Sequence, residues 1–452
     1  MSWSVLPVEV TLEIIEYLCP EINVGQIGKA AAWTKLWQTN NTDMEAEQNS
    51  NEGGGSEGVL SGSTQALSTN PWSALQSLAL TNKYFYKLCI PFAHRDFVFT
   101  SNDWTPITDE LVSKWVKHGG NVRNVRILLD PGFTLLFRYW EFLATTLATF
   151  TNVTSLALYY RSCHSLPRKV AEECVNILKT GKVLEFGIYS TVILEYKLGN
   201  LTWDRRMAWM AYDIIQQFSN NAAAANKLRV LDLVLETLPT EIYNLVRTQF
   251  PNLRALTIRR ALRYQTLGRI WDANQLPYWK HRDNLTCLRL IDCSNAYAFH
   301  IPHLVRHFTS LRELMVSTCG ASDDDTVGVQ RSGGWSTESD ALRNTHAPLE
   351  VFHIEHMTDW EIYALGVIPT KELSTSLITR GHLEAAFTRD PEIFPGLVLL
   401  RVEEYVNLEE TTYREPTMAN APRTIKTLNA ICTGRGIKVE KDAKWIRRKY
   451  IA

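Results

Sequence analysis

The sequence predicts an α/β protein in which a small helical N-terminal domain precedes a long, irregular solenoid of parallel strands and helices. Two features of the sequence point to this fold class. A motif led by leucine or valine recurs nine times after residue 120, and two amphipathic stretches flank an acidic segment before residue 100. With 452 residues, of which 45% are hydrophobic, the chain is long enough to bury a sizeable core.

The first 100 residues are predicted to form a helical domain that a disordered loop interrupts. Residues 39–70 carry five acidic residues and no Lys or Arg. Such a segment buries too little apolar surface to offset the entropy cost of ordering it. A second apolar pattern follows over residues 75–92, and an inserted loop of this length costs little closure entropy. The apolar residues at helical spacing before the loop are Leu6, Val10, Ile14, Ile15 and Leu18.

The rest of the chain, residues 101–452, contains the repeated motif. Each copy has apolar residues at positions one, four and six, as in LRVLDL from Leu228 and LRALTI from Leu253. The copies start 25 residues apart in that pair and up to 48 residues apart elsewhere. The longer spacings leave room for a missed copy or for inserts, which we expect near residues 190–226 and 320–347. The leading residues are Val122, Val153, Val183, Leu228, Leu253, Leu285, Leu311, Leu349 and Leu397.

The segments between the motifs predict helices. In residues 238–250, apolar side chains recur at helical spacing before the next motif, and residues 170–181 end with Gly181 in the position of a helix C-cap. Alternating strands and helices of this kind stack into a solenoid whose parallel strands line one side.

Side chains at the odd positions of each motif are predicted to face outward. Because side chains alternate along a strand, positions three, five and seven lie opposite the buried positions four and six. Exposed Tyr, Arg and Met are enriched at protein interfaces, and mixed charges favour a polypeptide over a phosphate backbone. The candidate target-binding residues are Tyr159, Tyr189, Asp232, Arg259, Arg289, Met315, His353 and Arg401.

The charge balance argues against a surface built for nucleic acid or for a membrane. Lys plus Arg number 47 and Asp plus Glu number 48, which gives a formal net charge of -1. Eight Cys without a C-x-x-C pair predict reduced thiols, and the N-terminus lacks the basic start of a secretory signal. We therefore expect a cytoplasmic or nuclear protein with neither a nucleic-acid nor a membrane partner.

The motifs that would suggest a metal site, a catalytic site or a phosphate-binding site are incomplete. His303 and His307 lie one helical turn apart with Cys293 upstream, but zinc requires a complete tetrahedral set and an ordinary polar helix face is the commoner arrangement. The HIEHM sequence from His353 lacks the H-E-x-x-H spacing, and no phosphate-binding glycine motif occurs. We expect no catalytic residue, no metal and no cofactor.

The stretch LPVEVTLEIIEYL, from Leu6 to Leu18, resembles the opening helix of an F-box, and residues 75–99 resemble its second half. The acidic loop departs from the F-box pattern, which usually has a short turn at that place. The repeat region is similar to the leucine-rich-repeat arm that is joined to an F-box in many fungal proteins. The resemblance therefore implies a leucine-rich-repeat solenoid behind an F-box.

The resemblance also implies a function. An F-box protein of this kind is the substrate receptor of a Skp-cullin-F-box ubiquitin ligase and marks a target for ubiquitin-dependent degradation without being an enzyme itself. The implied partners are a Skp-type adaptor, a cullin held through it, and an unidentified protein substrate. Two alternatives are a leucine-rich-repeat scaffold outside any ligase and an enzyme with a site in the inserts. The implied adaptor-binding residues are Leu6, Pro7, Val10, Ile14 and Leu18.

Overall fold

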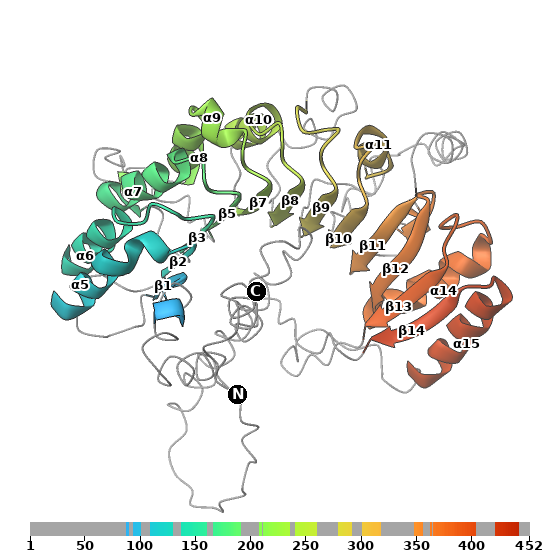
Figure 1. Ribbon diagram of the computed structural model, residues 1–452. Helices are drawn as coiled ribbons and strands as arrows, with labels where there is room; N and C mark the ends of the chain where they lie inside the picture. The colour runs from blue at the N-terminus through green and yellow to red at the C-terminus, as the bar shows by residue number, and fades with distance from the viewer. Residues whose placement is uncertain are drawn as a thin grey trace, which may run out of the picture.

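The fold is known from a computed structural model. It describes residues 87–89, 94–100, 109–129, 137–160, 166–190, 208–209, 211–235, 240–259, 279–291, 301–317, 348–355, 362–363, 365–403 and 421–442. Within these ranges the chain forms an open arc with strands on its inner side and helices on its outer side (Figure 1). No helix in the described ranges has the length and apolar content needed to cross a membrane.

The inner side of the arc is one parallel sheet of twelve strands in the described residues. The strands lie in chain order, each hydrogen-bonded to its neighbours in the sheet, and the sheet does not close, so β1 and β14 are its edges. The strands are β1 (Asp96–Thr100), β2 (Asn124–Leu129), β3 (Ser155–Tyr160), β5 (Glu185–Ser190), β7 (Val230–Leu235), β8 (Ala255–Arg259), β9 (Cys287–Ile291), β10 (Glu313–Ser317), β11 (Leu349–Glu355), β12 (Thr370–Ser376), β13 (Leu399–Glu403) and β14 (Lys438–Asp442).

The strand pairing confirms all nine predicted copies of the motif. Strands β2, β3, β5, β7, β8, β9, β10, β11 and β13 each fall on one copy, and equivalent motif positions pair across neighbouring strands, as Leu231 does with Leu256. The apolar residues at positions one, four and six are buried, for example Leu228, Leu231 and Leu233. The period of two therefore directs one face of every strand into a continuous core.

Three strands of the sheet fall on no copy of the motif, namely β1, β12 and β14. In β12 the two inward positions hold Leu373 and Thr375, and the leading leucine is missing. Strand β1 lies inside the range assigned to the helical domain, yet it pairs in parallel with β2 and buries Phe97 and Phe99. The repeat array therefore starts before residue 101.

Helices and turns return the chain along the outer side of the arc. Neighbouring helices pack on one another, as α6 does on α7 and α14 on α15. A short antiparallel pair of strands, β4 (Leu166–Pro167) and β6 (Ala208–Trp209), lies beside α7. The helices are α5 (Asp109–His118), η2 (Gly119–Asn121), α6 (Phe137–Leu147), α7 (Arg168–Lys179), α8 (Ala211–Ser219), α9 (Ala222–Ala225), α10 (Thr240–Gln249), α11 (Ile301–His307), α14 (Leu377–Arg389) and α15 (Ala421–Gly434).

The helices α7 and α10 confirm two predictions. In α10, Ile242 and Val246 are buried, and α7 is followed by Gly181 with a positive φ of 68°. Part of the predicted insert over residues 190–226 belongs to the array instead. Helix α8 buries Phe218 in the core, where its ring centroid lies 6.1 Å from that of Phe186 and 5.5 Å from that of Phe250. Residues 39–70, Cys293 and residues 320–347 lie outside the described ranges.

Candidate functional site

The concave face of the sheet carries one polar row across eight adjacent strands. Each strand from β7 to β14 contributes the residue at its fifth motif position, and the sheet register places each beside the next. We call these residues the central row. Its members are Asp232, Thr257, Arg289, Met315, His353, Ser374, Arg401 and Glu440.

The same row changes character toward the N-terminal end. There the fifth position holds Gly187 in β5 and Ala157 in β3, both buried, while Val98 in β1 is exposed. The fifth position of β2 holds Arg126, and beside it Asn124 Nδ2 donates to Asp96 Oδ1 at 2.6 Å. The polar side chains at the fifth position are therefore continuous only from β7 onward.

The middle of the central row holds a buried ion pair. The Arg289 guanidinium lies 2.5 Å from the Glu313 carboxylate on β10, measured from Nη2 to Oε1. Burial alone lowers the pKa of Arg289, but the neighbouring Cys287, Glu313 and Asp232 outweigh it and raise the pKa above its usual range. Arg289 therefore stays charged although its side chain is only 8% exposed.

Cys287 lies in β9, two residues before Arg289, and is the one thiol on the central strands. Burial raises the pKa of this thiol to about 12, although the Arg289 charge acts in the opposite direction. Since the thiolate is the nucleophilic form, Cys287 is an inert thiol at neutral pH.

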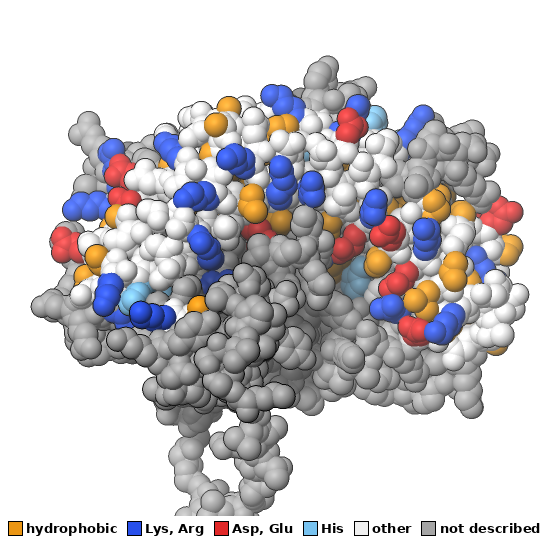
Figure 2. Space-filling model, in the orientation of Figure 1, with side chains coloured by type: hydrophobic (Ala, Val, Ile, Leu, Met, Phe, Trp, Pro, Cys, Tyr) orange, Lys and Arg blue, Asp and Glu red, His pale blue; other side chains and the backbone are white. Residues whose placement is uncertain are grey.

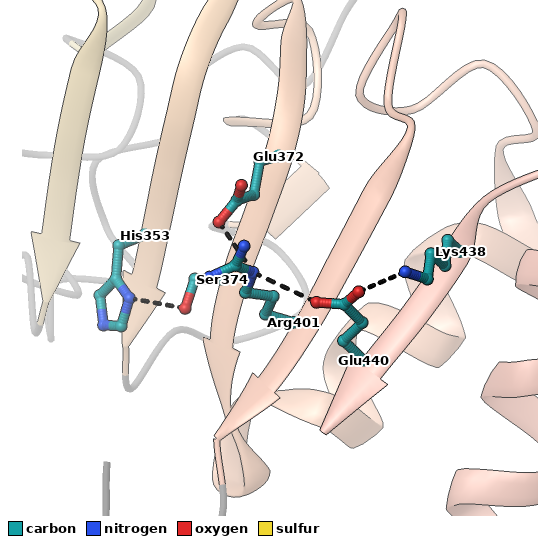
Figure 3. A network of polar contacts seen from close by, with 6 residues as sticks. All are labelled: His353, Glu372, Ser374, Arg401, Lys438 and Glu440. Carbon is teal, nitrogen blue, oxygen red and sulfur yellow. Dashed lines mark hydrogen bonds and ion pairs between the residues drawn. The ribbon is translucent and has the colours of Figure 1, made fainter. Parts of the chain in front are cut away.

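A second polar network occupies the C-terminal end of the row (Figure 3). Arg401 Nε lies 3.0 Å from Glu372 Oε1 on β12 and 3.7 Å from Glu440 Oε2 on β14. Glu440 also contacts Lys438 at 2.5 Å. On the neighbouring strands, His353 Nδ1 and Ser374 Oγ are 3.0 Å apart and form a hydrogen bond.

These two networks give the face a mixture of both charges. Arg289, Arg401 and Lys438 are cations, and each lies against a carboxylate of the same face. A phosphate backbone binds to surfaces where cations predominate. The central row instead offers both donors and acceptors at the spacing of neighbouring strands, about 4.8 Å, which suits the polar groups of a polypeptide.

The structure brings five of the eight candidate target-binding residues into the central row, namely Asp232, Arg289, Met315, His353 and Arg401. Tyr159, Tyr189 and Arg259 lie two positions later in β3, β5 and β8, and the side chains of these three are outside the described part of the structure. The adaptor-binding candidates Leu6, Pro7, Val10, Ile14 and Leu18 also lie outside it.

The expected solvent exposure of the row was wrong for four of its members. Asp232, Arg289, Met315 and His353 are each no more than 9% exposed, whereas the Arg401 side chain is 38% exposed. Side chains on adjacent parallel strands stand only about 4.8 Å apart, so each covers part of its neighbours. The ion pair with Glu313 also keeps the Arg289 side chain close to the sheet and so limits its exposure to solvent.

Sequence reasoning missed the partners of Arg401. Glu372 and Ser374 belong to β12, and Lys438 and Glu440 belong to β14, two strands that carry no leading leucine. Once β13 had been recognised, a lateral neighbour on each side was required, but no motif indicated which segments would supply it.

In the described residues, no three His, Cys, Asp or Glu side chains are grouped so that they could hold a metal ion. His303 and His307 lie on α11, on the outer side of the arc, and burial lowers the pKa of His307 with help from Arg306, Arg282 and His303. The central row has ion pairs and hydrogen bonds but no nucleophile with a lowered pKa among the described residues.

The fold and the face together define a class of protein: an open α/β repeat array with a polar concave surface. Comparison with known proteins adds no family to this description, since no family model matches the chain and no curated protein matches it significantly.

Proposed function

We propose that this protein is the substrate-recognition subunit of a Skp-cullin-F-box ubiquitin ligase. The observation that carries the proposal is a combination of two parts of one chain. A Leu-Pro segment whose sequence resembles the opening of an F-box precedes an open arc with a polar, charge-balanced inner row. We further propose that the arc is a leucine-rich-repeat solenoid, which agrees with the motif spacing and with the parallel strands.

In this role the protein accelerates ubiquitin transfer without reacting itself. The N-terminal Leu-Pro segment binds the adaptor, the central row binds the target, and the complex holds the target beside the ubiquitin-loaded conjugating enzyme. Such proximity converts a reaction between separate molecules into one within a complex. No side chain of this chain needs to act as a nucleophile.

The adaptor contact is tested by affinity purification of the full chain followed by mass spectrometry. We expect Leu6→Glu/Pro7→Glu to lose the Skp-type adaptor and the cullin, because two carboxylates would be buried in an apolar helical interface. The control Asn429→Glu/Ala430→Glu adds the same charge on an exposed part of α15 and should keep both partners. Recovery of the adaptor by neither wild type nor control would contradict the proposal.

The target contact is tested with Arg401→Met in the same purification. Its ion pairs with Glu372 and Glu440 are partly exposed, so we expect a change in stability below about 1 kcal/mol. Proteins that stay with Leu6→Glu/Pro7→Glu but are depleted by Arg401→Met are the expected targets. An unchanged set of proteins with Arg401→Met, at unchanged stability, would remove the central row from target binding.

A scaffold outside any ligase is the second candidate function. The same arc supports this candidate function, which differs from the ligase proposal only in the partner of the N-terminal segment. Depletion of proteins by Arg401→Met without recovery of a cullin by wild type would identify it.

A further inference from the structure

A second surface, separate from the concave face, lies along the turns that lead into the strands. These turns connect the outer helices to the amino ends of β1 to β10. A ladder of side chains joins each turn to the one before it: Asn252 Nδ2 donates to Asn226 O at 2.8 Å, and Asn284 Nδ2 donates to Pro251 O at 3.0 Å. The turns therefore form a continuous, ordered edge.

The charges on this edge are almost all positive. The described turns before β1 to β10 contain nine Lys or Arg residues and one acidic residue, Asp283. We call the nine residues the basic edge. They are Arg95, Arg123, Lys182, Lys227, Arg229, Arg254, Lys280, Arg282 and Arg312.

This segregation contrasts with the balance of the whole chain, in which 47 basic residues face 48 acidic ones. In Figure 2 the Lys and Arg side chains follow the middle of the arc, and the Asp and Glu side chains gather mainly toward its two ends. Successive turns are about 4.8 Å apart, which is less than the Debye length of about 8 Å at physiological ionic strength. Arg282 and Arg312 are paired with Asp283 and Glu350, and the other seven cations add to one positive potential.

The cations differ in how firmly they are held. Arg123 Nη1 donates to Asn152 O at 2.9 Å, and Arg229 Nη1 donates to Asn252 O at 3.2 Å, so these two charges are fixed by backbone carbonyls. Lys227, Arg254 and Lys280 are exposed to solvent. The edge thus combines positioned charges with side chains that can reach a partner.

The length of the edge matches a short extended peptide. Eight strands with seven steps of about 4.8 Å span roughly 34 Å. An extended polypeptide rises about 3.3 Å per residue, so about ten residues would cover that length. A peptide in which several of those residues are Asp or Glu would meet the cations one turn after another.

A single-stranded nucleic acid fits this edge less well. Such ligands bind where basic residues alternate with exposed aromatic rings on which the bases stack. The aromatic rings of the described turns point into the core instead: Phe150, Phe250, Trp279 and Phe308 are at most 3% exposed. The edge offers charge without a stacking platform.

We propose that the basic edge binds an acidic stretch of a polypeptide, rich in Asp and Glu. This inference rests on the proposed function and deepens it. The targets of the ligase would be proteins that carry such an acidic stretch. The central row would then contact a second part of the same target.

The test measures binding of a labelled twelve-residue peptide in which Asp and Glu alternate with Ser, by fluorescence anisotropy with the purified full chain. The comparison probes are the same peptide with Asn and Gln, and a twelve-nucleotide oligothymidylate. We expect the acidic peptide to bind more tightly than both, with an affinity that falls as salt rises.

The variant Lys227→Glu/Arg254→Glu/Lys280→Glu reverses three exposed cations of the edge and should weaken peptide binding about tenfold. The control Lys169→Glu/Lys179→Glu/Arg389→Glu makes the same change in net charge on α7 and α14 and should bind like the wild type.

Three results would overturn the inference: no peptide binding by wild type at low salt, equal loss in both variants, or tighter binding of the oligothymidylate. Each of these can occur while adaptor recovery is intact, and peptide binding can persist where the adaptor is not recovered. Failure of the basic edge and failure of the ligase proposal are therefore distinguishable.

Discussion

Gly366→Ala is expected to lower the free energy of unfolding of the C-terminal part of the arc by about 2 kcal/mol. A Cβ at Gly366 would lie 1.9 Å from Ile393 Cγ1 and 2.4 Å from Ile393 Cδ1. Ile393 is buried, and the Phe394 amide beside it donates to Gly366 O at 2.6 Å. Neither segment can move away without losing that hydrogen bond. Urea unfolding followed by circular dichroism measures the effect.

Two further variants show whether the cost comes from this contact. In Gly366→Ala/Ile393→Ala the offending side chain is removed, so the double variant should be less destabilised than the sum of the two single changes. Gly434→Ala, at the end of α15, places its Cβ in open space and should be neutral or stabilising by about 0.5 kcal/mol. Additive losses in the double variant would show that crowding at Ile393 is not the cause.

Acid should weaken the protein through His281. The imidazole is fully buried between Trp279 and Phe308, with ring centroids 5.1 and 6.4 Å away. Burial lowers the pKa of His281 to about 4, although the nearby backbone of Phe250 acts in the opposite direction. Between its ordinary pKa of about 6.5 and about 4, the unfolded chain therefore binds a proton that the folded chain does not.

Because the unfolded chain binds this proton and the folded chain does not, the free energy of unfolding falls as the pH falls. The contribution of His281 is fully present above pH 6.5 and is lost as the pH falls toward 4, by up to about 3 kcal/mol. His281→Phe should remove this part of the pH dependence and leave stability near pH 7.5 changed by less than about 1.5 kcal/mol. Urea midpoints at pH 7.5 and 4.5 provide the comparison.

A remaining pH dependence in His281→Phe is expected to come from His94. Its pKa is lowered to about 4 by burial and by the nearby His118 and Lys114. The His94 and His118 rings stack with centroids 4.1 Å apart. Adding His94→Phe should flatten the profile further. If His281→Phe overpacks the core, His281→Leu offers the same test, and an unchanged acid loss in both would contradict the role of His281.

Much of the sheet could be predicted because the motif is strong. Apolar residues at positions one, four and six fix which face of a strand is buried, so nine strands could be placed from the spacing alone. The strands β12 and β14 were missed for a physical reason. Strand β12 buries Thr375 at a position where the motif requires a large apolar residue, and β14 begins with Lys438, so neither shows the expected pattern.

The candidate site was predicted in part. The period of two identified Asp232, Arg289, Met315, His353 and Arg401 as residues of the inner face. The ion pairs of Arg289 with Glu313 and of Arg401 with Glu372 depend on lateral pairing between strands 24 and 29 residues apart in the chain. The basic edge was missed because each turn contributes at most two cations, which become neighbours through the sheet.

The unbroken register of the sheet has a consequence for how binding specificity can evolve. Each strand from β7 to β14 supplies one member of the central row, and the strands keep their alignment through backbone hydrogen bonds. A substitution at one fifth position therefore alters a single point of the contact surface without displacing the others. In the proposed function, new partners can therefore be acquired through independent mutations at these fifth positions, while the backbone of the array stays the same.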